Sequence, residues 1–255
     1  MDKRNFWNQL LLFIVLLIAL IVIREYFSYK WIESGMDSYA THIYLGIAIN
    51  MVLIIVSYIF IKRNGILQIA GIRGSKLRKA SLLIFPLVYL VLLNGLFLDE
   101  IQTKYLSLLM LYCISVGFAE ELSIRGFIQS YVIKHFGTSK KNLVLSIFAS
   151  SIFFGLLHLF KFDKGIYGEI SQIFFATFIG AMFGVLLVLT KRIYPLIIIH
   201  TIIDFVAKLD SAGKPVKNII SEPTSLENSI LTVLLVLPCL IYALFLIKKY
   251  SLTQQ

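Results

Sequence analysis

Charged residues are scarce in this chain. They make up 15% of its 255 residues, whereas about 25% is usual in soluble globular proteins. Hydrophobic residues make up 58%, and the mean hydropathy is +0.86. This composition excludes an ordinary soluble domain and predicts an all-α polytopic membrane protein.

Cysteine is rare as well. Cys113 and Cys239 both fall inside apolar runs, and neither belongs to a CxxC or Cys/His metal-binding spacing. Disulfide cross-links are therefore not expected. The chain also lacks internal repeats, low-complexity tracts and flexible linkers. We therefore expect residues 1–255 to form a single integral membrane domain.

Acidic residues are fewer than basic ones, 14 against 24, which gives a formal net charge of +10. Basic residues crowded into short loops are what the positive-inside rule predicts, so no nucleic-acid partner is expected. If the N-terminus is cytoplasmic, fifteen of the 24 Lys and Arg residues lie on the cytoplasmic side and eight on the outer side, with Arg125 left inside a span. Both termini are therefore predicted to be cytoplasmic.

The loop from Lys62 to Lys79 carries six of the inner charges and no acid. It is interpreted as a topology determinant, with contact to an acidic partner or lipid head group as the alternative.

A membrane-spanning helix needs about 20 mostly apolar residues, and the sequence contains eight such runs. Between the first two, residues 29–40 mix aromatic and charged side chains and are interpreted as a short interfacial segment. The eight predicted spans are Phe6–Arg24, His42–Ile61, Ser81–Leu98, Lys104–Ile128, Asn142–Phe160, Gly168–Thr190, Ile193–Leu209 and Ser229–Ile247.

Three ionisable residues stand close together inside the fourth predicted span. Glu120, Glu121 and Arg125 each cost about 2.5–3.5 kcal/mol to insert into a membrane on translocon scales. Glu121 and Arg125 are four residues apart and share one face of the helix, so we expect them to form an ion pair. Glu120 is left without such a partner, which makes this stretch the leading site hypothesis.

Two histidines repeat this pattern, His158 near the end of the fifth predicted span and His200 within the seventh. Residue 139, in the turn expected between the fourth and fifth spans, is the midpoint between Glu120 and His158. The two can therefore face each other at one height, about 25 Å from that turn at 1.5 Å per residue. His200 would lie about 10 Å deep, counted from Ile193 at the cytoplasmic side. We therefore expect one site within the membrane, nearer its cytoplasmic face.

The motifs Glu-Glu-x-x-x-Arg, Phe-x-x-x-His and His-x-x-x-Asp, in this order and in helical segments, resemble those of the CAAX protease and bacteriocin-processing family of intramembrane endopeptidases. The resemblance covers about residues 110–210, which would form the protease core. The better-studied prenyl proteases of the family usually carry Asn at the last motif position. This chain has Asp204 there, as many bacterial members do.

The resemblance implies a catalytic role for four residues. Glu120 would be the base that activates water for peptide hydrolysis, and His158 would share that water. His200, with Asp204 beside it, would stabilise the oxyanion or orient the substrate carbonyl.

Three further residues would support this chemistry. Glu121 would pair with Arg125 and fix the helix, and Phe154 would pack one turn from His158 and shape the cavity. A glutamate in a low-dielectric cavity suits general-base chemistry, and a neighbouring cation counteracts that effect. Two adjacent glutamates can therefore have different roles.

An alternative chemistry uses zinc. Glu120, His158 and His200 are the candidate ligands, with one coordination position left open for water. The zincin spacing His-Glu-x-x-His is absent from the sequence. A metal-free glutamate mechanism without a cofactor is favoured, because two carboxylates and Arg125 already supply a base and its counter-charge.

The favoured function is an intramembrane endopeptidase that cuts a membrane-associated peptide or protein near the cytoplasmic face. The first alternative is a non-catalytic immunity or scaffold protein in the bilayer, and the second is a transporter or proton relay. The compact, Lys- and Ile-rich chain favours a bacterial plasma membrane. The sequence predicts no oligomeric state.

Overall fold

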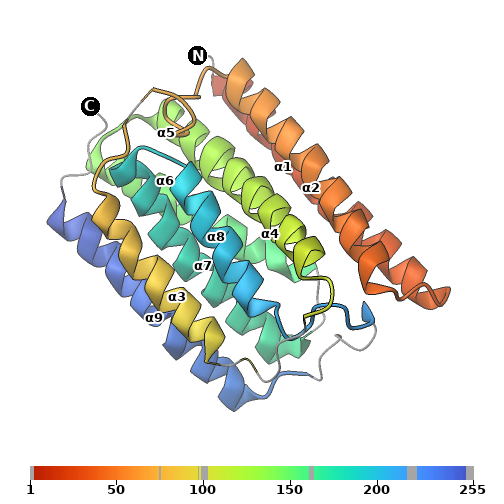
Figure 1. The fold of residues 1–255 in the computed structure, drawn as a ribbon. Coiled ribbons are helices and arrows are strands. Elements are labelled where there is room, and N and C mark those ends of the chain that lie inside the picture. Colours follow the sequence, from red (N-terminus) through yellow and green to blue (C-terminus); the bar gives the residue numbers. More distant parts are fainter. Residues whose placement is uncertain are drawn as a thin grey trace.

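The computed structural model describes residues 3–74, 76–96, 98, 103–160, 164–216 and 223–250, and every regular element within these ranges is helical (Figure 1). This confirms the all-α fold class predicted from the sequence. Three short segments, η1, η2 and η3, have 3₁₀ or π geometry, and the other elements are α-helices. In chain order the elements are α1 (Lys3–Glu33), α2 (Tyr39–Arg63), η1 (Ala80–Leu83), α3 (Ile84–Gly95), α4 (Leu106–Glu121), η2 (Leu122–Gln129), α5 (Ser130–Phe136), α6 (Lys140–Leu157), η3 (His158–Phe160), α7 (Gly165–Thr190), α8 (Tyr194–Ala207) and α9 (Leu226–Lys249).

Six of the eight predicted spans are helices long and apolar enough to cross a membrane. The other two, predicted at 81–98 and 193–209, form shorter apolar helices, Ala80–Gly95 and Tyr194–Ala207. The 14 residues of α8 give a length of about 21 Å, less than the roughly 30 Å of a bilayer core. Helix α8 packs between α3 and α4, and Ile198 on its outward face stays exposed.

The first helix is longer than predicted. It was expected to end near Arg24, with an interfacial segment from residue 29, but α1 continues through that segment to Glu33. No glycine or proline interrupts residues 25–33. Gly35 follows two residues after the end of the helix, and its φ of +83° is the left-handed conformation that glycine adopts readily.

The helices form one layered bundle (Figure 1). The α1–α2 hairpin lies on one side, against α4, while α3 and α9 lie on the other side, against α8 and α7. Between them α4, α6, α7 and α8 form the centre. The second half of α7 is buried without interruption from Ile179 to Thr190, so this helix is the core of the bundle.

Helix α1 begins and α9 ends at the same end of the bundle (Figure 1), as a chain crossing the membrane an even number of times requires. At this end Lys134 Nζ donates to the Asn64 carbonyl oxygen at 2.6 Å, and the Ile193 N–H donates to the Gly71 carbonyl oxygen at 3.3 Å. The assignment of this end to the cytoplasm stays a prediction. Lys161 and Lys217, counted on the outer side, lie outside the described residues.

Candidate active site

A cavity of about 380 Å³ lies inside the bundle, and six helices supply most of its wall. Apolar side chains of α1 and α2 form one side, and side chains of α6 and α7 form the other. Helices α4 and α8 carry Glu120, His200 and Asp204. Four of the polar residues expected from the sequence, Glu120, His158, His200 and Asp204, line this one cavity.

The two glutamates stand at the junction between α4 and the π-helical segment η2. A π-helical turn widens the helix and occurs often at functional sites. All eight residues of η2 are buried. The Ser130 hydroxyl donates to the Arg125 carbonyl oxygen at 2.8 Å, so a side chain satisfies one of the backbone groups in this irregular turn.

Glu121 and Arg125 form the ion pair expected from their spacing, with Arg125 Nη1 2.8 Å from Glu121 Oε1. Both side chains are buried. The Arg125 guanidinium also lies over two aromatic rings, 4.7 Å from the centre of Phe154 and 5.7 Å from that of Phe183. A cation over an aromatic face gains up to about 2 kcal/mol when it is desolvated, which offsets part of the cost of burying this arginine.

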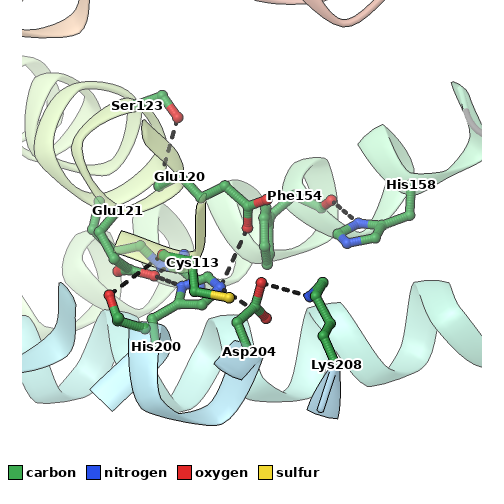
Figure 2. A network of polar contacts seen from close by, with 11 residues as sticks. Cys113, Glu120, Glu121, Ser123, Phe154, His158, His200, Asp204 and Lys208 are labelled. Atoms are coloured by element: carbon green, nitrogen blue, oxygen red, sulfur yellow. Dashed lines mark hydrogen bonds and ion pairs between the residues drawn. The ribbon is translucent and has the colours of Figure 1, made fainter. Parts of the chain in front are cut away.

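His200 lies between three carboxylates (Figure 2). Its Nδ1 is 2.8 Å from Glu121 Oε1, and since an ionised carboxylate only accepts hydrogen bonds, Nδ1 carries the hydrogen. Its Nε2 is 3.5 Å from Glu120 Oε2 and 3.9 Å from Asp204 Oδ1. Both distances exceed a direct hydrogen bond, so Nε2 faces the space between these two acids.

Asp204 has a second partner that the sequence interpretation missed. Lys208, one helical turn further along the chain, donates from Nζ to Asp204 Oδ2 at 2.7 Å (Figure 2). Lys208 was counted among the outer-side charges, at the end of the span predicted at 193–209, but its side chain lines the cavity. Its i,i+4 spacing from Asp204 was the signal that could have identified it.

His158 is on the opposite wall and contacts its own helix. Its Nδ1 is 3.1 Å from the Phe154 carbonyl oxygen, and because a carbonyl only accepts, Nε2 is the nitrogen left with a lone pair. The rings of Phe154 and His158 meet edge to face at 5.1 Å, as their spacing predicts. No hydrogen bond or ion pair joins His158 to Glu120 within the described residues.

The zinc alternative requires Glu120, His158 and His200 to converge. Within the part of the chain that the structure describes, no three His, Cys, Asp or Glu side chains are arranged to hold a metal ion. The arrangement does not fit a zinc ion, and we derive no step through one.

The sequence interpretation also missed polar residues at the edge of the cavity. Arg24 of α1 donates from Nη2 to the Tyr112 hydroxyl of α4 at 2.8 Å, which ties the first helix to the core. The buried Glu169 carboxylate accepts from the Lys164 N–H at 2.9 Å. Arg24 and Glu169 lie near the ends of their predicted spans, where charged residues are expected. Their positions in the sequence therefore did not mark them as cavity residues.

The cavity is open toward one end of the bundle. Arg24, Lys164 and Lys208 all lie near helix ends opposite the N-terminus, so the cavity extends to that end of the bundle. The sequence placed His200 by its distance from Ile193, taken to lie at the other surface. Ile193 is buried and its N–H donates to the Gly71 carbonyl oxygen, whereas Tyr194, the first residue of α8, is exposed.

A helical membrane bundle with acids, cations and histidines around one internal cavity defines a polytopic membrane protein with an intramembrane polar site. Residues 102–206 match the family model of type II CAAX prenyl endopeptidase Rce1-like proteins. This match contains all three motifs and confirms the resemblance to the CAAX protease family that they indicate. No curated protein and no solved structure matches the chain.

Proposed function

We propose that this protein is an intramembrane endopeptidase that hydrolyses a peptide bond of a membrane-associated peptide or protein. The family match supports protease-type activity. The observation that carries the mechanism is the unequal surroundings of the two adjacent glutamates. Glu121 is buried and bonded to Arg125 and His200, whereas 34% of the Glu120 side chain is exposed to the cavity.

In this mechanism Glu120 takes the proton from a water molecule that attacks the peptide carbonyl carbon. His158 shares this water through Nε2, the nitrogen that its bond to Phe154 leaves available. His200 donates to the carbonyl oxygen as negative charge develops on it, and donors fixed in advance stabilise such an oxyanion. Glu121 and Arg125 hold the His200 ring in position.

The decisive experiment measures cleavage of a panel of reporter peptides by the purified protein in detergent, with wild type beside Glu120→Gln. Glutamine has nearly the same shape but cannot act as the base. We expect the variant to fold and to lose cleavage. Cleavage retained by Glu120→Gln would refute the mechanism.

The panel should pair lipidated peptides with unmodified ones of the same sequence, because apolar side chains of α1, α2, α6 and α7 line much of the cavity. If no wild-type cleavage is observed, the same pair of proteins is compared in cells. A phenotype that survives Glu120→Gln at equal protein level would favour the immunity or scaffold alternative.

A further inference from the structure

Lys208 is a cation inside the cavity to which the proposed mechanism gives no role. Its Nζ lies 2.7 Å from Asp204 Oδ2, and about one third of its side chain is exposed. A lysine on a cavity wall can extend into open space and take up water. This one instead folds back onto the acid one turn earlier on its own helix (Figure 2).

The charges around His200 show why this contact matters. Carboxylate oxygens of Glu120, Glu121 and Asp204 all lie within 3.9 Å of its ring nitrogens. Among the described side chains, Arg125 forms an ion pair with Glu121, and Lys208 forms one with Asp204. Without Lys208 the Asp204 carboxylate would keep, among the described side chains, only the two histidines of the cavity, His200 and His158, as nearby partners of positive charge.

The contact also divides the two oxygens of Asp204. Oδ2 accepts from Lys208, and Oδ1 faces His200 Nε2. A carboxylate fixed at one oxygen cannot rotate freely about its last bond, so the direction of the other oxygen is set.

We propose that Lys208 is a positioning residue of the active site. It holds Asp204 by Oδ2 as a carboxylate, so that Oδ1 stays directed at His200 and the imidazole keeps its orientation toward the cavity. This proposal rests on the endopeptidase function proposed above. It implies that a neutral amide at position 204, which needs no counter-charge, makes Lys208 dispensable.

The competing interpretation is structural. A cation at the carboxyl end of a helix is favourable whatever it contacts, and Lys208 is the residue that follows α8. In that case the loss of Lys208 has the same effect whether residue 204 is Asp or Asn.

A double-mutant cycle separates the two interpretations. Lys208→Met is made in wild type and in Asp204→Asn, and kcat and KM are measured on the cleaved reporter peptide. We expect Lys208→Met to lower kcat by about tenfold or more in wild type and by less than about twofold in Asp204→Asn. Lys208→Arg, which keeps the charge, should retain most of the activity.

The matched control is Lys214→Met, the same substitution at an exposed lysine in the segment after α8 that does not line the cavity. It should leave kcat unchanged. Equal losses from Lys208→Met in both backgrounds, or no loss in either, would overturn the proposal.

A second measurement does not depend on cleavage. The protein is labelled with ¹⁵N-histidine in detergent, and the His200 ring signals are assigned by their loss in His200→Gln. We expect Lys208→Met to shift these signals in wild type and to leave them nearly unchanged in Asp204→Asn. If this shift occurs, the positioning role stands even where no peptide of the panel is cleaved, and the endopeptidase function is then decided by the comparison in cells. If Lys208→Met leaves the His200 signals unchanged in wild type, the positioning role fails.

Discussion

Glu120 and Glu121 are consecutive in the chain, yet their carboxylates lie in opposite surroundings. The Glu121 side chain is fully buried between Arg125 and His200, whereas one third of the Glu120 side chain faces the cavity. Successive residues of a helix point in directions about 100° apart, so one backbone step separates a structural acid from an acid open to substrate and water.

This difference predicts unequal effects of the same substitution. Glu120→Gln should lower the cleavage rate by about 100-fold or more, the usual contribution of a general base, and leave thermal unfolding in detergent unchanged. Glu121→Gln should lower both the cleavage rate and the unfolding temperature, because it leaves Arg125 buried without its counter-charge. Each variant serves as the control for the other. Equal loss of stability in the two variants would contradict the assignment.

The Glu121–Arg125 ion pair predicts a strong coupling in stability. Removing one partner of a buried pair costs about 3–5 kcal/mol, because the other charge is left uncompensated. We expect Arg125→Met to destabilise the protein by about this amount, and the double variant Glu121→Gln with Arg125→Met to lose less than the sum of the single variants. Unfolding in detergent, followed by circular dichroism, measures all three. Additive losses would show that the pair is not coupled.

Phe154 should act through Arg125 as well as through packing. Phe154→Leu removes the ring 4.7 Å from the guanidinium and should cost about 1–2 kcal/mol beyond the packing loss, whereas Phe154→Tyr keeps the aromatic face. Phe153→Leu, on the preceding residue of α6, is the matched control because Phe153 makes no contact with Arg125 among the described cation–π pairs. Equal destabilisation by Phe153→Leu and Phe154→Leu would show that the cation–π contact adds nothing to the stability.

Gly117 sets the distance between α4 and α8. A Cβ atom at this position would lie 2.7 Å from Thr201 Oγ1 and 3.0 Å from the Ile197 carbonyl oxygen. Gly117→Ala should therefore push α8 outward, displace His200 from Glu121 and reduce cleavage. Gly95→Ala is the control, since a Cβ atom there meets nothing within 4 Å. Cleavage assays of both variants test this, and an unaffected Gly117→Ala enzyme would argue against the close packing.

Metal removal should leave the activity unchanged. In the proposed mechanism the base and the charges around it all belong to the chain. We therefore expect the same cleavage rate before and after incubation with a zinc chelator, measured beside a known zinc protease as the control. Cleavage that is lost in chelator and restored by added zinc would instead assign His158 and His200 as metal ligands.

The membrane class and the approximate spans follow from the sequence, because hydropathy is a local property that each segment carries in its own residues. The Glu121–Arg125 ion pair could be predicted from the sequence for the same reason. Both residues belong to one helix, and their spacing fixes their shared face. The family was likewise recognisable from three motifs whose spacings are written in the chain.

Helix ends were less predictable than helix centres. The sequence allowed α1 to stop at Arg24 or to continue to Gly35, since charged and aromatic residues are compatible with either. The short length of α8 was also not predictable from the sequence. Ile193 is apolar whether it lies at the membrane surface or is buried against Gly71.

The sequence by itself determined which residues are polar within apolar helices, and it thereby identified Glu120, His158 and His200. Only the tertiary structure decided how they meet: His200 contacts both glutamates, whereas His158 faces them across the cavity without contact. Contacts between helices depend on the rotation of each helix about its axis and on its depth in the bundle. Packing against all neighbours sets both quantities, so no single segment encodes them.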